Sequence, residues 1–393
     1  MNILVASFSF PPNQDGVAEA AAAGVLSFLA QGWKVDVATA RSSPPRSSLN
    51  GKGARVFEFG ISGTPYFRDP FRDEVHNYQT FLLKGNWDVI VFHGYSWPLL
   101  CAVPFLDQLP AKKVLISHGY GALIWHPVKR APFGLSMLAH SAYRSIRMLA
   151  WAQKIDRWVF LSQRRDFRAF YDHLLATAIR HPGIAVIPNG VDPACTGQGA
   201  RFRKALNIPE TTLVFLCVGY FSRGKNQVQT LAAYQRARIP HSCLVFIAPE
   251  PNEWMHRCRA LAPNQGSTAE GTKVFWFTQQ SREFALDAFA GCDIYVSCST
   301  LETQPISLLE AMRERKPWVA LPVGSIPDLP GGLCAKSCAE FSQAMHRLAT
   351  DPTARQRLGQ QGRQAIVSTY SSVRQGDAMT QLIRNLALAP DAS

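Results

Sequence analysis

The sequence predicts an α/β protein made of two Rossmann-like domains, each with a parallel sheet covered by helices on both faces. Three observations lead to this expectation. Short, continuously apolar segments alternate with helical patterns along the chain, which is typical of parallel sheets buried on both sides. The alternation restarts after a turn-rich break at residues 182–192. A length of 393 residues also suits two domains, each with its own core.

The first forty residues predict one strand–helix–strand unit. Residues 2–7 form an apolar strand, the Ala-rich stretch up to Ala30 forms a helix, and residues 33–38 form the second strand. Further strands of the first domain are predicted at 55–59, 87–92, 113–117 and 157–161.

The second half repeats the same alternation. Its apolar strands are predicted at 212–218, 243–248, 273–277, 293–297 and 318–321. Ligands of parallel sheets bind at the carboxyl ends of the strands. We therefore expect the functional site in a cleft between two facing domains.

Composition and charge narrow the class of protein. Apolar residues make up 47% and charged residues 18%, which excludes a disordered chain. The net charge of +13 favours polyanionic partners such as nucleic acid, an anionic membrane or phosphorylated substrates. Nine cysteines without a CxxC pair argue against a zinc site. Because we see neither a secretory signal nor a spanning apolar run, we expect a cytoplasmic protein.

The strongest chemical signal is a pair of carboxylates seven residues apart. Glu302 and Glu310 follow the predicted strand 293–297. Pro305 suits the first turn of a helix and Thr303 or Gln304 its cap, which places Glu302 in the loop and Glu310 inside the helix.

The start of this helix is expected to bind phosphate. The free amides of residues 304–307, Ile306 included, would face the cleft, where a helix N-terminus readily binds an anion. Beside such a phosphate site, the carboxylates of Glu302 and Glu310 could bind neutral hydroxyls, one the hydroxyls of a ribose and the other those of a sugar ring. The alternative is that both glutamates are ordinary surface residues.

In this context the sequence resembles the family-four glycosyltransferases, which are retaining enzymes with the GT-B fold. Glu302 and Glu310, followed by residues 316–320 and 323–328, resemble the donor-site signature of that family. The other motifs occur in family order over nearly the whole chain. They are the N-terminal phosphate loop at 10–16, the histidine turn at 117–119, the hinge at 187–192 and the basic loop at 218–226.

The resemblance implies sugar transfer from a nucleotide-diphosphate donor to an acceptor hydroxyl, with retained anomeric configuration and without a metal or other cofactor. Glu310 would bind the ribose, and Glu302 would orient the donor sugar as a catalytic residue. The implied donor-binding residues are Gly16, Arg223, Lys225, Thr303, Gln304, Pro305, Ile306 and Glu310. Lys225 and Arg223 would stabilise the negative charge that develops on the leaving diphosphate.

The chain departs from the family pattern at three positions, Tyr220, Asp15 and Gln304. Tyr220 stands where the family has an arginine, so Arg223 would substitute for it or remain a solvated side chain. Asp15 stands where the family has a first glycine, which leaves Gly16 for the phosphate contact. Asp15 could instead cap the following helix.

Two histidines follow predicted strands of the first domain. His93 comes after residues 89–92, and His118 after residues 114–117, so both are expected in the cleft. His118 matches the cleft histidine of the family and is the second expected catalytic residue. His93 and Tyr95 would line the acceptor side. The alternative is that these histidines have structural roles.

A basic stretch favours a membrane as the polyanionic partner. Residues 127–181 carry ten Lys or Arg against three Asp, interleaved with large apolar residues. This pattern fits a helix lying on an anionic bilayer, although an ordinary core-packed helix with a basic face remains the alternative. Nucleic acid is not expected, because no recognition helix or aromatic RNA-binding motif accompanies the charge. The protein would then be peripheral on the inner face of the cytoplasmic membrane.

The resemblance also assigns domains and a substrate class. Residues 1–190 would form the acceptor-side domain, residues 191–370 the nucleotide-sugar donor domain, and residues 371–393 a helix returning to the first domain. The expected activity is hexosyl transfer to a lipid-linked or cell-surface glycan, as in polysaccharide or lipopolysaccharide biosynthesis.

Two other classes of function stay open. A nucleotide-sugar epimerase or a glycogen-type phosphorylase could have the same fold. A non-catalytic nucleotide-sugar binding protein would explain the departures at Asp15, Tyr220 and Gln304. The presence of Glu302, Glu310, Lys225 and His118 together favours an active transferase.

Overall fold

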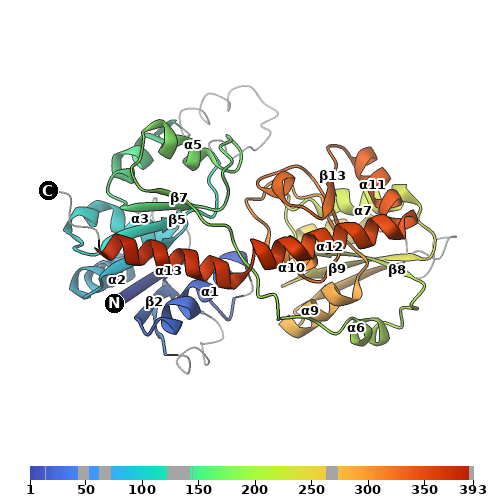
Figure 1. Ribbon diagram of the computed structural model, residues 1–393, viewed down its shortest axis with the longest axis horizontal. Helices are drawn as coiled ribbons and strands as arrows, with labels where there is room; N and C mark the ends of the chain where they lie inside the picture. The colour runs from blue at the N-terminus through green and yellow to red at the C-terminus, as the bar shows by residue number, and fades with distance from the viewer. Residues whose placement is uncertain are drawn as a thin grey trace. The chain divides into compact units, whose positions relative to one another are not determined.

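The computed structural model describes residues 1–13, 15–42, 53–61, 72–121, 142–143, 145–262 and 273–388. The chain divides into two compact units, which we call unit 1 (Met1–Asn189 with Val373–Ser393) and unit 2 (Gly190–Ser372). Each unit has one sheet with helices packed on it (Figure 1). Both sheets are parallel, so the predicted fold class of two Rossmann-like α/β domains is confirmed.

Unit 1 is built on a seven-stranded sheet with the order β3-β2-β1-β4-β5-β6-β7. Its register places Ser7 opposite His93, and His93 opposite Ile116. The carboxyl ends of β1, β4 and β5 therefore lie at one edge of the sheet. The strands are β1 (Asn2–Ser7), β2 (Lys34–Ala40), β3 (Arg55–Phe59), β4 (Val89–His93), β5 (Lys112–Ile116), β6 (Arg157–Phe160) and β7 (Ile184–Val186).

The helices of unit 1 cover both faces of this sheet because successive strand residues point to opposite sides. Leu4 packs in the cluster formed with α2 (Arg72–Lys84) and α3 (Trp97–Ala102). Ile3 packs in the cluster formed with α1 (Gly16–Ala30) and α13 (Ser372–Leu388). Two shorter helices with described bounds are η2 (Val103–Gln108) and α5 (Tyr171–Ala178).

Helix α13 lies directly against α1 although the two are far apart in sequence (Figure 1). Gly376 is so close to Ser27 that an added Cβ would lie 2.1 Å from the Ser27 hydroxyl oxygen. Arg384 also donates a hydrogen bond to the side chain of Gln31. The close approach requires glycine at this position of α13.

Unit 2 is built on a six-stranded sheet with the order β10-β9-β8-β11-β12-β13. Because β8 and β11 are parallel neighbours, the loops that follow them leave the same edge of the sheet. The strands are β8 (Leu213–Val218), β9 (Ser242–Ala248), β10 (Lys273–Thr278), β11 (Ile294–Ser297), β12 (Trp318–Ala320) and β13 (Gly332–Cys334).

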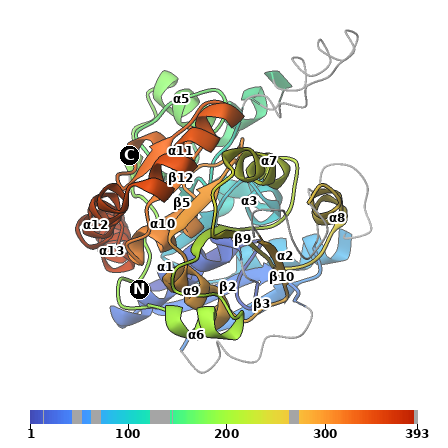
Figure 2. The same cartoon turned by 90° about the vertical axis from the view of Figure 1, so that its right-hand side faces the viewer.

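The helices of unit 2 also cover both faces, as Figure 2 shows for α7 and α11 on one side and α6 and α9 on the other. Phe215 belongs to the core cluster of α7 (Gln227–Ala237), α8 (Glu253–Ala260) and α11 (Cys338–Thr350). Leu216 belongs to the opposite cluster, built with α6 (Gly199–Ala205), α9 (Arg282–Gly291), α10 (Ile306–Arg313) and α12 (Pro352–Ser368). A short turn, η3 (Ile326–Asp328), precedes β13.

Within the part of the chain that the structure describes, no helix combines the length and the hydropathy needed to cross a membrane.

Candidate active site

Two loops of unit 2 meet at the carboxyl edge of its sheet. The basic loop, residues 219–226, follows β8, and the loop of residues 298–305 follows β11. The carbonyl of Gly224 accepts hydrogen bonds from the Thr300 amide (2.8 Å) and from the Ser299 hydroxyl (3.2 Å). The sequence motifs that carry Lys225 and Glu302 are therefore joined directly by backbone hydrogen bonding.

Lys225 and Glu302 form an ion pair at this junction. The Lys225 Nζ lies 2.7 Å from Glu302 Oε1, and the side chain of Glu302 is only 10% exposed. Gly324, with φ of +55°, packs so tightly on this loop that an added Cβ would lie 2.2 Å from the Glu302 carbonyl oxygen. The loop thus holds the Glu302 carboxylate in place beside a cation that still has solvent access.

Glu310 is buried, which excludes the alternative of an exposed helix residue. Its side chain is 4% exposed and accepts a hydrogen bond from the guanidinium of Arg282, the first residue of α9. Arg282 is 41% exposed, so the pair connects a buried carboxylate to the surface. Sequence reasoning missed Arg282, because nothing in the motif pattern marks a cation at the start of α9.

Helix α10 begins one residue later than its sequence predicts. Pro305, expected in the first turn, is instead the N-cap with an extended backbone (φ −72°, ψ 119°), and neither Thr303 nor Gln304 is the cap. The carbonyl of Pro305 accepts from the Leu308 and Leu309 amides, so the ring occupies the last non-helical position. A proline cap has no side-chain acceptor, and the first-turn amides of α10 keep their capacity to bind an anion.

The surroundings of α10 fix its position. Ser307, in its first turn, bonds through its hydroxyl to the Tyr295 hydroxyl at 2.7 Å, and the carbonyl of Thr303 accepts from the Ser325 amide at 2.7 Å. Gln304 is buried, whereas Ile306 is partly exposed. These contacts position the start of the helix beside Glu302.

Arg223 is exposed at the tip of the basic loop. Among the described residues it has no hydrogen-bond or ion-pair partner. Tyr220, which stands in place of the family's arginine, is 46% exposed on the same loop. The basic loop therefore offers one cation that is already paired, Lys225, and one that is available, Arg223.

In unit 1 the two predicted histidines contact each other. His93 Nδ1 lies 3.1 Å from His118 Nε2, and the rings are stacked with centroids 5.3 Å apart. Burial, followed by the neighbouring His118, holds the pKa of His93 well below 6.5. Burial lowers the pKa of His118 to about 4, against the opposing charge of Asp15. Both rings are therefore neutral at neutral pH, with one N–H group donated between them.

A buried carboxylate that sequence reasoning did not assign to the site lies under the histidine turn. Asp172 accepts hydrogen bonds from the Tyr95 hydroxyl (2.7 Å) and from the Ser117 hydroxyl. Burial raises its pKa to about 6, although these hydrogen bonds oppose the shift. Ser117 in turn accepts from the Gly119 amide at 3.0 Å, so the network holds the backbone on either side of His118.

This network changes the interpretation of Tyr95. Its hydroxyl donates to Asp172 and accepts from the indole of Trp158 at 2.9 Å, so both hydrogen-bonding functions are used inside unit 1. His93 is 3% exposed. His118, the second residue after the end of β5, is partly exposed. Tyr95 is partly exposed as well, but its hydroxyl is already engaged.

Asp15 caps helix α1. Its carboxylate accepts from the Val17 and Ala18 amides, each at 2.9 Å, and from the hydroxyl of Ser9. Gly16 is the first residue of the helix and is exposed. Because a carboxylate already occupies two first-turn amides, this helix start offers a phosphate less than the family's glycine pair would.

The predicted membrane-facing stretch is described only in part: residues 127–141 and residue 144 lie outside the described residues. Met148 and Trp151, which contributed to the expected amphipathic pattern, are buried in the core of unit 1, as the core-packed alternative holds. Tyr143 and Ile146 are exposed (54% and 67%), as is Phe167 (62%).

Comparison with known proteins identifies the domain in unit 2. Residues 199–365 match the family model described as "Glycosyl transferases group 1". No curated protein matches the sequence. The matched region contains the basic loop, the Lys225–Glu302 pair and the whole of α10.

Solved structures with the same fold cover almost the whole chain. A sucrose-phosphate synthase from Thermosynechococcus elongatus is 18% identical with a TM-score of 0.76, covering 98% of both chains. Anabaena HepE, solved in complex with UDP-glucose, is 16% identical with a TM-score of 0.68, covering 98% of this chain and 100% of that one. WaaG, a glycosyltransferase involved in lipopolysaccharide biosynthesis, is 14% identical with a TM-score of 0.68, covering 97% and 99%.

These comparisons establish the two-domain Rossmann-like architecture of unit 1 and unit 2 as the GT-B fold. With a group 1 glycosyltransferase domain in unit 2, the protein is a glycosyltransferase of the GT-B fold.

Proposed function

We propose that the protein transfers a hexosyl group from a nucleoside diphosphate donor to an acceptor hydroxyl, with retained anomeric configuration and without a metal ion. The observation that carries this proposal is the Lys225–Glu302 pair at the start of α10, with Glu310 buried in the same helix. This arrangement combines a cation and free helix amides for a diphosphate with carboxylates for sugar and ribose hydroxyls. The complex of Anabaena HepE with UDP-glucose supports a donor of this class.

The chemistry follows from where charge develops. As the bond between the sugar C1 and the diphosphate oxygen breaks, negative charge grows on the diphosphate, and Lys225, Arg223 and the first-turn amides of α10 stabilise it. The acceptor oxygen attacks C1 on the face that the diphosphate leaves, and its proton passes to the departing phosphate oxygen. Glu302 orients the sugar, and His118, neutral at pH 7, exchanges hydrogen bonds with sugar hydroxyls without adding charge.

Glu310 is proposed to bind the ribose of the donor. Replacing it by alanine is expected to raise the KM for the donor about thirtyfold, because two charge-assisted hydrogen bonds to ribose hydroxyls are lost. The measurement is release of nucleoside diphosphate from UDP-, GDP-, dTDP- and ADP-sugars, with and without a membrane extract as acceptor. EDTA is expected to leave the rate unchanged.

The matched control for this experiment is Arg282→Ala, which removes an ion-pair partner of Glu310 and keeps its carboxylate. A smaller KM effect is expected for that variant than for Glu310→Ala. Release that is independent of extract would instead favour hydrolysis or an epimerase, and binding of a donor without turnover would favour a non-catalytic binding protein. If no nucleotide sugar bound at all, the proposal would be wrong.

The proposed acceptor is a lipid-linked or cell-surface glycan, reached by peripheral contact with an anionic membrane. Ile146 and Phe167 are exposed large apolar residues, and Arg147, Arg165 and Arg168 beside them in sequence are exposed cations. The two segments are held together because Phe167 stacks on Tyr171, whose hydroxyl bonds to Ser145 at 3.0 Å. Exposed apolar side chains among cations are the combination that binds anionic lipid surfaces.

The double variant Ile146→Glu with Phe167→Glu is expected to bind vesicles of phosphatidylglycerol about tenfold more weakly than the wild type, because two apolar anchors are lost and two repelled charges are added. Co-sedimentation with such vesicles measures this. Leu261→Glu, the same kind of change at an exposed leucine in unit 2, is expected to have little effect. An equal loss of vesicle binding in the double variant and in Leu261→Glu would contradict the membrane contact. Wild-type binding to purely zwitterionic vesicles as strong as to phosphatidylglycerol vesicles would contradict it as well.

A further inference from the structure

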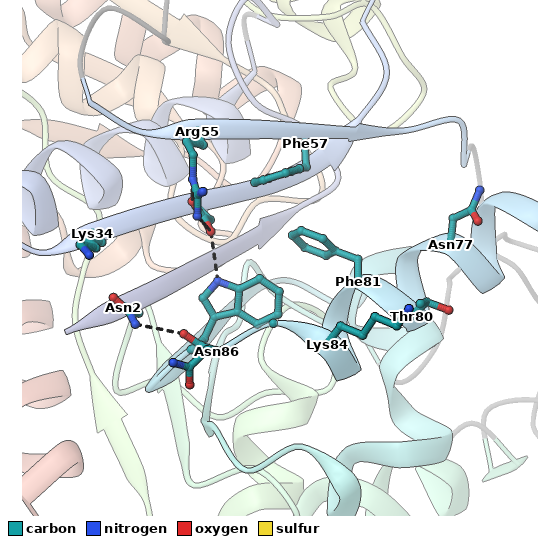
Figure 3. A pocket seen from close by; sticks show the side chains of 12 residues that line it. Asn2, Lys34, Arg55, Phe57, Asn77, Thr80, Phe81, Lys84 and Asn86 are labelled. Atoms are coloured by element: carbon teal, nitrogen blue, oxygen red, sulfur yellow. Dashed lines mark hydrogen bonds and ion pairs between the residues drawn. The ribbon is translucent and has the colours of Figure 1, made fainter.

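A pocket of about 600 Å³ opens at the amino-terminal edge of the unit 1 sheet (Figure 3). Its walls come from the starts of β1, β2 and β3 and from the second half of α2. The histidine pair lies at the other edge of the same sheet, where β4 and β5 end. At about 3.3 Å per residue, the length of β1 places the two edges roughly 17 Å apart. The pocket is therefore separate from the histidine site.

Three aromatic rings line the pocket. The centroid of the Phe81 ring lies 4.8 Å from the centroid of Phe57 and 4.8 Å from that of Trp87. Phe57 and Phe81 are only partly buried, so they keep surface that a ligand can cover. Gly85 allows the indole to lie against the chain, since an added Cβ would lie 1.9 Å from its ring. Apolar surface of this kind favours the C–H face of a sugar ring over a freely hydrated ion.

Among the described residues that line the pocket, the one acid, Asp36, is already neutralised. Asp36 binds Arg55 through two hydrogen bonds of 2.8 Å, and the indole nitrogen of Trp87 lies 3.3 Å from the same carboxylate. The side chain of Asp36 is 11% exposed against 76% for Arg55. The carboxylate thus anchors the wall and contributes little negative field to the opening.

Two further cations face the pocket without an acid to balance them. Lys34 and Lys84 are both lining residues and both exposed. Among the residues that the structure describes, neither has a carboxylate within ion-pair distance. The rim also supplies amide and hydroxyl groups, from Asn2, Asn77, Thr80 and Asn86. The pocket therefore combines apolar rings, hydrogen-bonding groups and an excess of positive charge.

We propose that this pocket binds an anionic saccharide, a sugar ring that carries a carboxylate or a phosphate group, at a second site in unit 1. The ring covers Phe57 and Phe81, the anionic group pairs with Lys34 and Lys84, and the rim amides bind the hydroxyls. Such a site holds a charged residue of a glycan away from the place of transfer. The inference goes beyond the proposed function and does not require transfer to occur.

Calorimetric titration of the full chain at low ionic strength tests the proposal with four probes. Methyl glucuronide and glucose 6-phosphate are expected to bind, and methyl glucoside and inorganic phosphate are expected to bind much more weakly. Lys34→Ala with Lys84→Ala is expected to weaken the charged sugars about fivefold or more, since two solvent-exposed ion pairs are lost. The control Lys204→Ala with Lys336→Ala removes the same charge from exposed sites in unit 2 and is expected to change nothing.

A second variant tests the aromatic wall. Phe81→Leu keeps an apolar side chain and is expected to weaken both charged sugars while leaving inorganic phosphate unaffected. Binding of methyl glucoside as strong as that of methyl glucuronide, binding of phosphate as strong as that of glucose 6-phosphate, or no binding of any probe would each overturn the proposal. Nucleoside diphosphate release is measured separately, so failure of the pocket and failure of the transfer reaction are distinguishable.

Discussion

Replacing Lys225 by alanine is expected to lower the rate of sugar transfer by about two to three orders of magnitude, the typical cost of removing one preorganised group that stabilises developing charge. The reason is positional: the ammonium is held 2.7 Å from Glu302 at the junction of the two loops, beside the start of α10. An ammonium has three donors, so it can hold Glu302 and a diphosphate oxygen together. The measurement is kcat for nucleoside diphosphate release at saturating donor.

A second variant separates catalysis from charge balance. In Lys225→Ala the Glu302 carboxylate, 10% exposed, loses its partner and repels the diphosphate as well. The double variant with Glu302→Gln removes that repulsion. If Lys225 stabilises the leaving group, the double variant stays within about tenfold of Lys225→Ala, because no cation is restored. Recovery of most of the activity would show instead that Lys225 only neutralises Glu302. Lys204→Ala, at an exposed site of the same unit, serves as the control for charge loss.

The fold was predictable because the apolar strand segments and the helical patterns between them indicate the same architecture. Strands such as β4 and β8 are short apolar runs, and the helices between them have the pattern of elements packed on one face. The start of α10 was misplaced by one residue, because proline is compatible with both the first helical turn and an extended cap. Sequence alone does not distinguish these positions, whereas the extended backbone of Pro305 (φ −72°, ψ 119°) does.

The polar partners of the site residues were much less predictable. Glu302 and Lys225 belong to motifs, but their ion pair depends on the adjacency of β8 and β11, which brings together residues 77 apart. Arg282 and Asp172 belong to no motif at all. Asp172 lies in a basic stretch of the sequence and becomes a buried acceptor because α5 starts against the end of β5, where Ser117 and Tyr95 meet it. Such contacts are consequences of tertiary packing.

Asp172 is expected to make the stability of unit 1 depend on pH in an unusual direction. Its pKa is raised from 3.8 to about 6 in the folded chain, so between these values the folded state binds more protons than the unfolded state. The contribution of this group is fully present below pH 3.8 and is lost as the pH rises through 6. The shift corresponds to about 3 kcal/mol of the free energy of unfolding by pH 7.5.

The histidines above the network act in the opposite sense. The pKa of His118 falls to about 4 and that of His93 lies well below 6.5, so each ring destabilises the folded state when acid forces it to charge. Their loss of stability begins as the pH falls below 6.5 and is complete below their folded pKa values. The free energy of unfolding of the wild type therefore changes with pH through both effects. The contribution of Asp172 is obtained by comparing the wild type with a variant that lacks this carboxylate.

The variant Asp172→Asn separates the contribution of Asp172 to the pH dependence of stability from that of the histidines. The amide oxygen can still accept from Tyr95 and Ser117, but the side chain no longer titrates. The difference in unfolding free energy between variant and wild type is expected to move in favour of the variant by about 2.5 kcal/mol between pH 4 and pH 7.5, whatever its constant offset. Hydrogen exchange of the amides of β5 and β6, corrected for intrinsic rates, measures this as local opening of unit 1. Ser117→Ala keeps the carboxylate and removes one of the hydrogen bonds that oppose its raised pKa, so it should retain a pH dependence of the same sign and at least the wild-type size. A difference that is flat between pH 4 and 7.5 in Asp172→Asn would show that the carboxylate is not held at a raised pKa and that another group is the acceptor beneath the histidine turn.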